Sequence, residues 1–256
     1  MSTVSVRHVW KEYGPHVVLE NLDLEIADHE FVTIIGASGC GKTTFLRMLL
    51  GVEQPTRGEI CIDGVPLTPE PGPERGIVFQ RYSLFPHLTA IENLVFGLEL
   101  KRARLCGRLF GARRRAALRR AQAMLEQVGL AAARDRFPAQ LSGGMQQRLS
   151  IAQSVICEPK ILLLDEPFGA LDPGLTADMH KLILELWSAN RMTIFMVSHD
   201  LKESFELGTR LLTFDRPRID PQAPERYGAA VTYDLKLRRQ PGMVTLPGAA
   251  PAALTA

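Results

Sequence analysis

Hydrophobic and polar residues alternate near the start of the chain. Val4 and Val6 are separated by polar neighbours, and residues 22–26 repeat the pattern, which is the period of two expected of half-buried strands. Residues 31–35, Phe-Val-Thr-Ile-Ile, are almost continuously apolar, as is typical of a strand covered on both faces. Further strands are predicted at 60–62, 76–79, 161–164, 192–197, 211–214 and 231–237.

Helical patterns separate the strands. The spacing predicts a helix over residues 43–50, ended by Gly51. Residues 89–135 are rich in the helix formers Ala, Leu, Arg, Gln and Glu. Strands and helices on either side of a helical insert predict an α/β core with an inserted helical subdomain.

These elements predict a single domain over residues 1–239, with the helical subdomain at about 89–157. Residues 240–256 hold Pro and Ala and few anchoring side chains, so a disordered tail is expected there.

Composition narrows the class of protein. The chain has 256 residues, 46% of them hydrophobic, which suffices for a core without metals or disulfides. Its four cysteines form no CxxC pair, so neither a disulfide framework nor a zinc site is predicted, and a reducing cytosol fits best. No stretch approaches 18 apolar residues, so no segment is expected to span a bilayer.

Residues 36–43, Gly-Ala-Ser-Gly-Cys-Gly-Lys-Thr, match the phosphate-binding spacing G-x-x-x-x-G-K-[ST] between a strand and a helix. Lys42 is expected to neutralise the β- and γ-phosphates, Thr43 to give its hydroxyl to Mg²⁺ and Thr44 to contact the α-phosphate. The backbone N–H groups expected to wrap the phosphates belong to Gly36, Ala37, Ser38, Gly39, Cys40 and Gly41.

Two carboxylates follow the predicted strand 161–164. Asp165 stands at the strand end, where we expect it to hold Mg²⁺ through water. Glu166 comes next and is expected to face the γ-phosphate, where a carboxylate can polarise the attacking water.

A second anion-binding pattern lies at residues 141–148, Leu-Ser-Gly-Gly-Met-Gln-Gln-Arg. Ser142 and the N–H groups of Gly143 and Gly144 would lie at a helix N-terminus, which favours anions. A simple N-cap with a flexible turn is the alternative use of such a stretch. One site has no need of two phosphate-gripping surfaces, so the active site is expected to form between two copies of the chain.

Together these motifs resemble the ATP-binding subunits of ABC transporters, over residues 4–215. The resemblance implies the fold of a P-loop NTPase, with an N-terminal antiparallel β subdomain and the helical insert, and it implies ATP and Mg²⁺ as ligands. Gln80 resembles the family's Q-loop glutamine, which contacts Mg²⁺ and senses the membrane partner. Asp172, in Ala-Leu-Asp at 170–172, resembles the D-loop aspartate, and His199 the switch histidine that orders the attacking water and Glu166.

The resemblance also extends to contacts with the base and across the dimer. Tyr13 stands where the family places an aromatic that stacks on adenine, with Trp10 as a nearby competitor. The residues implied to contact ATP held by the opposite subunit are Leu141, Ser142, Gly143, Gly144 and Gln146.

The implied role is that of an ATPase at the cytoplasmic face of the inner membrane, bound to permease subunits and indirectly to a solute-binding protein. Met145 and the stretches 81–87 and 165–172 resemble the subgroup that serves importers of nitrate, sulfonate and taurine. An exporter or lipid-trafficking ATPase is the main alternative. A soluble ABC protein acting on ribosomes or DNA is disfavoured, because those chains usually carry two cassettes or a long coiled-coil insertion.

Charge is concentrated in one place. The formal net charge is only +2, so no nucleic-acid partner is expected, yet residues 101–120 hold nine Lys or Arg and no acid. A solvated helix face is the ordinary explanation. Because anionic lipid attracts each nearby basic residue by about 1 kcal/mol, we also hypothesise that this run lies near the cytoplasmic leaflet.

Overall fold

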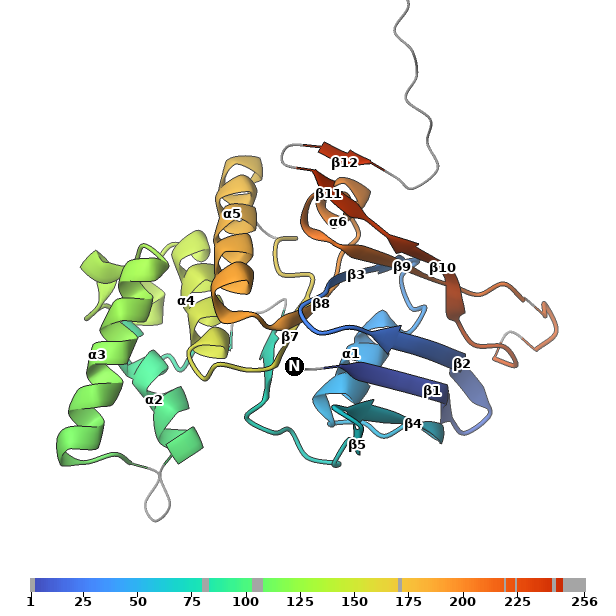
Figure 1. Ribbon diagram of the computed structural model, residues 1–256, viewed down its shortest axis with the longest axis horizontal. Helices are drawn as coiled ribbons and strands as arrows, with labels where there is room; N and C mark the ends of the chain where they lie inside the picture. The colour runs from blue at the N-terminus through green and yellow to red at the C-terminus, as the bar shows by residue number, and fades with distance from the viewer. Residues whose placement is uncertain are drawn as a thin grey trace, which may run out of the picture.

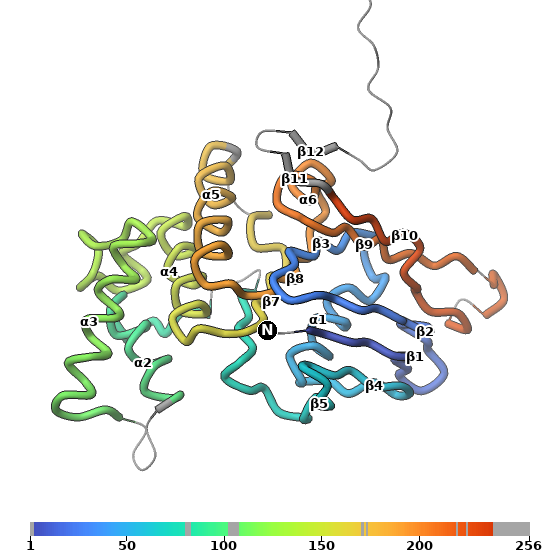
Figure 2. Tube along the Cα trace, in the orientation of Figure 1, coloured from blue at the N-terminus to red at the C-terminus, as the bar shows by residue number. Residues whose placement is uncertain are grey.

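The computed structural model describes residues 3–79, 83–102, 108–169, 172–218, 220–223, 225–240 and 243–245. The chain folds around a central sheet, with an antiparallel sheet on one side and a group of helices on the other (Figures 1 and 2). The α/β class predicted from the sequence is confirmed. The predictions for Gln80, residues 81–82, Ala170 and Leu171 fall outside the described residues.

The central sheet has six strands in the order β10-β9-β3-β8-β7-β6, and every neighbouring pair is parallel except β10 with β9. Because parallel strands end at the same edge of a sheet, this order brings the ends of β3, β7 and β8 together. The bounds are β3 (Phe31–Gly36), β6 (Arg75–Val78), β7 (Ile161–Asp165), β8 (Thr193–Val197), β9 (Arg210–Asp215) and β10 (Ala230–Lys236).

Both faces of this sheet are buried, and successive residues of a strand enter different cores. In β7, Ile161 and Leu163 join one hydrophobic cluster, while Leu162 and Leu164 join the other. Side chains in a strand alternate between its faces, so an uninterrupted apolar run is what two covered faces require. The sequence pattern of these strands follows from that double burial.

One core lies beneath the antiparallel sheet, whose order is β2-β1-β4-β5. Helix α1 (Lys42–Leu50) fills this core with Phe45, Leu46 and Leu49, which are fully buried. Apolar positions three and four apart lie on one helical face, so the same residues that form the helix also anchor it. The strands are β1 (Val4–Tyr13), β2 (His16–Ile26), β4 (Arg57–Ile62) and β5 (Val65–Pro66).

The second core is formed by helices against the opposite face of the central sheet (Figure 1). Its helices are α2 (Ala90–Arg102), α3 (Gly111–Gln127), α4 (Gly143–Val155) and α5 (Pro173–Asn190). Two 3₁₀ turns, η1 (Ala131–Ala133) and η2 (Pro138–Gln140), connect α3 to α4. The boundaries predicted for a separate helical subdomain stay a prediction.

The last elements are α6 (Leu201–Leu207) and a two-stranded pair of β11 (Arg238–Gln240) and β12 (Met243–Thr245). Strand β10 is fixed by Arg210, which donates two hydrogen bonds of 2.7 Å to the carboxylate of Asp234. The β11–β12 pair begins where the sequence predicts a disordered tail, and residues 246–256 lie outside the described part of the chain.

Candidate functional site

The phosphate-binding pattern forms the loop between β3 and α1. Gly36 ends β3, and Gly41 precedes α1 with φ of 86°. A Cβ on Gly41 would lie 2.6 Å from a methyl of Leu19, and one on Gly36 would lie 2.1 Å from the carbonyl oxygen of Phe214. The loop is therefore pressed against β2 and β9 so closely that both positions require glycine.

The loop curls around the ammonium of Lys42. Its Nζ donates to the carbonyl oxygens of Gly36 at 2.7 Å and Ala37 at 2.9 Å, and lies 3.8 Å from Sγ of Cys40. The side chain is buried, yet it borders an open cleft of about 360 Å³. This cleft is lined by Val18, Ser38, Gly39, Gly41, Lys42, Thr43, Thr44, Glu166 and His199.

Thr43, which lines the cleft, and Asp165 bring two oxygen atoms together that could both bind a metal ion. Oγ1 of Thr43 donates to Oδ1 of Asp165 at 3.3 Å, across 122 positions of sequence. Burial raises the pKa of Asp165 above its ordinary value, although the Thr43 hydrogen bond and Lys42 act in the opposite direction. A bound cation would relieve the cost of ionising this carboxyl.

These two oxygens fit Mg²⁺, which prefers oxygen ligands and usually takes only one or two carboxylates together with phosphates and water. Within the described residues, no group of three or more His, Cys, Asp or Glu could hold a metal ion by itself. The donor set therefore fits a magnesium ion that arrives with a triphosphate, rather than a metal site made by the protein alone.

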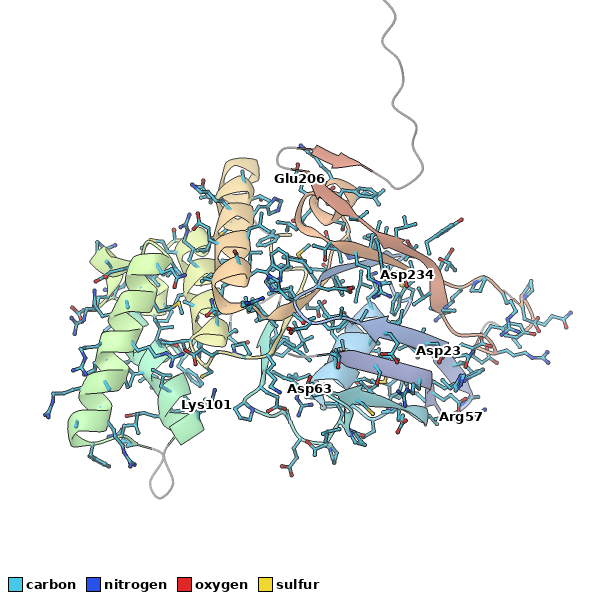
Figure 3. All side chains as sticks on the ribbon, viewed as in Figure 1. Asp23, Arg57, Asp63, Lys101, Glu206 and Asp234 are labelled. Atoms are coloured by element: carbon cyan, nitrogen blue, oxygen red, sulfur yellow. The ribbon has the colours of Figure 1, made fainter. Side chains whose placement is uncertain are left out.

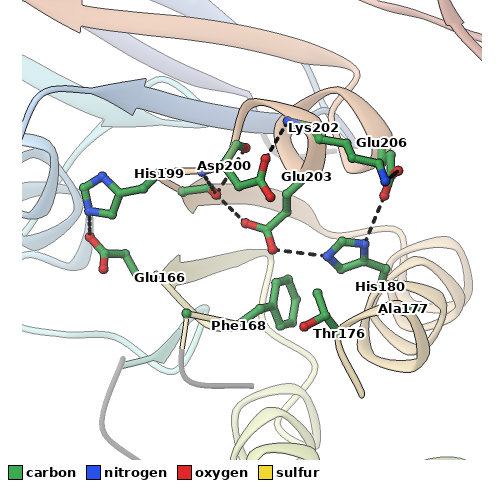
Figure 4. A pocket seen from close by; sticks show the side chains of 12 residues that line it. Glu166, Phe168, Thr176, Ala177, His180, His199, Asp200, Lys202, Glu203 and Glu206 are labelled. Carbon is green, nitrogen blue, oxygen red and sulfur yellow. Dashed lines mark hydrogen bonds and ion pairs between the residues drawn. The ribbon is translucent and has the colours of Figure 1, made fainter. Parts of the chain in front are cut away.

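Glu166 and His199 form an ion pair that faces the phosphate cleft, with Nε2 of His199 against Oε1 of Glu166 (Figure 4). Glu166 has φ of 49°, and its N–H donates to the carbonyl of Val197 at 3.1 Å. The adjacent ends of β7 and β8 thus present the carboxylate and the imidazole together.

Sequence reasoning missed the side chains that hold the segment carrying His199. A pocket of about 480 Å³ beside this pair contains Ser198, His180, Glu203 and Glu206 (Figure 4). Oγ of Ser198 donates to Glu203, whose other oxygen lies 3.2 Å from Nε2 of His180. Nδ1 of His180 lies 3.3 Å from Glu206. Helix α5 is thereby tied to α6 and to the segment that precedes it.

The ring of His180 lies between two glutamate side chains, with Nε2 against Glu203 and Nδ1 against Glu206. His180 and Glu203 are both largely buried. No motif marks these residues in the sequence; only the packing of α5 against α6 brings them together.

Tyr13 and Trp10 are distinguished by their surroundings. The ring of Tyr13 is 48% exposed, its hydroxyl donates to Glu53, and Nζ of Lys11 lies 4.8 Å from the ring centre. Burial of the hydroxyl and its bond to Glu53 raise the pKa of Tyr13 to about 12. Trp10 instead lies under the guanidinium of Arg57 on β4. Tyr13 is thus exposed and held through its hydroxyl, whereas Trp10 is partly buried.

The second anion-binding pattern begins α4. Ser142 is the N-cap, and its Oγ accepts the N–H of Met145 at 3.4 Å. Ser142 and Gly143 are exposed, whereas Gly144 is covered by Leu175 of α5. As far as the chain is described, none of residues 141–148 lines the phosphate cleft of the same chain.

The other residues predicted to contact the opposite subunit, Leu141, Gln146 and Asp172, have contacts within their own chain. Leu141 is buried in the helical core, so its side chain is not available to a ligand. Gln146 donates to the carbonyls of Pro138 and Leu141 and thereby fixes the turn before α4. Asp172 is exposed at the N-cap of α5, and its carbonyl accepts the N–H and the hydroxyl of Thr176.

Comparison with known proteins identifies the family. Residues 19–169 match the family model described as ABC transporter. The chain is 42% identical to the nitrate import ATP-binding protein NrtD of Synechocystis, over 77% of this chain and 71% of that protein. It is 40% identical to the bicarbonate transport ATP-binding protein CmpD of the same organism, over 82% and 73%, and 40% identical to the Fe(3+) ions import ATP-binding protein FbpC 1 of Rhizobium meliloti, over 88% and 62%.

A solved structure gives the same result. The ATP-binding cassette MJ0796, described as a dimer in a post-hydrolysis state bound to ADP and Pi, matches with a TM-score of 0.72 and 29% identity, covering 93% of this chain and all of the other. This chain therefore belongs to the ABC transporter family and is an ABC ATPase, and the predicted P-loop fold is confirmed.

Within the part of the chain that the structure describes, none of the helices combines the length and the apolar character needed to cross a bilayer.

Proposed function

We propose that this chain is the ATP-hydrolysing subunit of an importer for a small solute, and that two copies enclose ATP between the α1 loop of one and the α4 N-terminus of the other. The observation that carries this proposal is the separation of two anion-facing helix N-termini. One borders a cleft with Lys42 and Glu166, while the other is exposed and is not among the described residues that line this cleft. An exposed helix N-terminus is a ready site for a phosphate brought by a partner.

In this scheme each group has a stated task. Lys42 and the loop N–H groups hold the β- and γ-phosphates, and Thr43 and Asp165 hold Mg²⁺. Magnesium, when bound, neutralises charge on the phosphate oxygens. Glu166 accepts a hydrogen bond from the attacking water, and the ring of His199 holds that carboxylate and contacts the γ-phosphate. The ring face of Tyr13 stacks on the base.

The proposed binding partners are supported by what the related proteins are named for. The matched cassette is described as dimeric, which supports pairing of this chain with itself. NrtD and CmpD are named for transport, which supports association with permease subunits at the cytoplasmic face of a membrane, and through them with a solute-binding protein. The ATPase would be the part of such a system that converts hydrolysis into movement of the dimer.

The solute is proposed as a small anion of the nitrate, sulfonate or taurine kind. The names of NrtD and CmpD support an anion, whereas a similar identity to FbpC 1 supports importers more widely. None of these relatives is named for export. Growth or uptake assays of a strain lacking the gene, with nitrate, taurine and sulfonates offered singly, would test the solute.

The mechanism is tested by Glu166→Gln. We expect ATP binding to be retained, turnover to fall by a factor on the order of 10² to 10⁴, as when a general base is removed, and a stable dimer to appear with ATP. Size-exclusion chromatography with and without ATP, together with phosphate release, measures both effects. Glu185→Gln, on the exposed face of α5, is the matched control. Hydrolysis at the normal rate by Glu166→Gln would show that another group activates the water.

A further inference from the structure

The end of the α2–α3 hairpin presents large apolar side chains to solvent. Leu100, in the last turn of α2, is 63% exposed, and Phe110, the N-cap of α3, is 68% exposed. The N–H of Leu109 donates to Oε1 of Glu99 at 3.1 Å, which fastens the start of α3 to the end of α2. Both exposed residues therefore belong to one corner of the molecule, away from the central sheet (Figure 1).

Some cations of this corner are already engaged. Lys101 bonds to the carbonyl of Cys157 and is seen at the end of α2 in Figure 3. Arg114 lies 3.5 Å from Glu99, and Arg120 bonds to the carbonyl of Ile156 at 2.6 Å. Arg114 thus joins the two helices of the hairpin, while Lys101 and Arg120 attach the hairpin to the segment that follows α4.

Four other arginines remain open. Arg108, Arg113, Arg115 and Arg119 are exposed and form no ion pair with any residue for which the structure gives a position. No acid occurs between residues 108 and 125 to balance them. Arg115 and Arg119, four residues apart, lie on the same outer face of α3. We call the group of Leu100, Phe110, Arg108, Arg115 and Arg119 the hairpin tip.

We propose that the hairpin tip docks on an anionic lipid surface, with Leu100 and Phe110 in the headgroup region and the arginines against lipid phosphates. A membrane interface offers both kinds of contact, because phosphates lie beside the boundary of the acyl chains. Guanidinium groups bind phosphate oxygens in a bidentate manner. A nucleic acid would satisfy the arginines, but it would leave Leu100 exposed and offer stacking to Phe110 alone.

The test uses the full chain and sedimentation with vesicles. We expect binding to phosphatidylcholine vesicles that contain phosphatidylglycerol, weakening with salt, and little binding to phosphatidylcholine alone. The triple variant Arg108→Gln, Arg115→Gln and Arg119→Gln should bind about a hundredfold more weakly, roughly fivefold for each arginine. Arg7→Gln, Arg134→Gln and Lys181→Gln together remove the same charge from other exposed surfaces and serve as the matched control.

A second variant, Leu100→Ser with Phe110→Ser, should weaken vesicle binding while leaving its salt dependence. Phosphate release in solution should be unchanged in every variant, because none of these residues lies near the phosphate cleft. Equal binding to neutral vesicles, unaltered binding of the triple variant, or an equal loss in the control would each overturn the proposal. So would preferential retention on RNA that the triple variant loses.

Discussion

Helices α1 and α4 begin in opposite ways, although we propose that both N-termini bind phosphate. The first N–H groups of α1 follow Gly41, which has no side chain to cap them, so they stay directed at the cleft. Those of α4 follow Ser142, whose own hydroxyl accepts one of them at 3.4 Å. A helix leaves its first four N–H groups without internal partners. The uncapped end of α1 leaves its N–H groups to a ligand, whereas the cap of α4 satisfies one N–H and leaves those of Gly143 and Gly144 for a phosphate that a partner would bring.

This difference predicts that substitutions in α1 weaken nucleotide binding by a single chain, whereas substitutions in α4 impair only dimer formation and the hydrolysis that depends on it. Lys42→Ala should show the largest effect, with nucleotide binding weakened on the order of a hundredfold, because the loss of a buried charged partner typically costs about 2–5 kcal/mol. Fluorescence titration with a labelled ATP measures it. Lys181→Ala is the control, since that lysine is 79% exposed.

Lys42 also holds the loop carbonyls, so its variant needs a check on folding. A thermal midpoint close to that of the parent chain, together with weak binding, assigns the loss to the phosphates. Unchanged binding would contradict the assignment of the loop.

Ser142→Arg should impair the pairing of two chains rather than nucleotide binding by one. We expect one chain to bind ATP normally, while hydrolysis falls to about 1% or less, since a long cation blocks the surface that must meet the other subunit. Combined with Glu166→Gln, it should abolish the ATP-dependent dimer.

Ser142→Ala separates the loss of the α4 helix cap from the steric block that an arginine would cause at the dimer surface. It removes the hydroxyl alone and should cost about 0.5–2 kcal/mol of helix stability. If Ser142→Arg formed the dimer normally, α4 would not be part of the shared site.

Asp165→Asn should give the smallest effect of these substitutions, and it should stabilise the nucleotide-free protein rather than destabilise it. Burial makes the pKa of Asp165 higher in the folded than in the unfolded chain. The stability that this group contributes is therefore present at low pH and is lost as pH rises through the folded-state pKa. At neutral pH, Asp165→Asn should raise the melting temperature of the nucleotide-free protein and remove the further rise caused by Mg²⁺ with ATP.

Calorimetry across pH measures this effect. Below about pH 3, where the carboxyl is protonated in both states, the difference from the parent chain should vanish. Asp135→Asn, on a side chain that is 83% exposed, should show no such dependence. A destabilised Asp165→Asn at neutral pH would contradict the role of burial.

Local patterns were sufficient to predict the strand β3, the loop and α1, and the carboxylates after β7. The apolar run before Gly36 and the one that ends at Asp165 need only two covered faces to become parallel strands of one sheet, in which β8 lies between them. The sequence favoured Tyr13 but left Trp10 as a competitor, because β1 contains irregular pairing between Val9, Lys11 and Glu12. Such bulges change which face a side chain occupies and break the simple alternation.

Contacts between distant elements were also beyond the sequence. The bond between Tyr13 and Glu53 spans 40 positions, and the contact of His180 with Glu203 spans 23. Each depends on how two elements pack, and no spacing rule encodes that. Leu141 was predicted to contact ATP of the opposite subunit, but the sequence could not show that its side chain is buried, because this burial depends on the helical core that encloses it.

The backbone of Glu166 has a consequence for engineering. With φ of 49°, it occupies a conformation that costs a residue with a side chain roughly 1–2 kcal/mol, and that Gly or Asn adopts more readily. Replacement by Asn or Gly should therefore favour folding while removing the carboxylate. A search for thermostable variants of this ATPase would be drawn toward changes at this position, and screening by melting temperature alone would select inactive proteins.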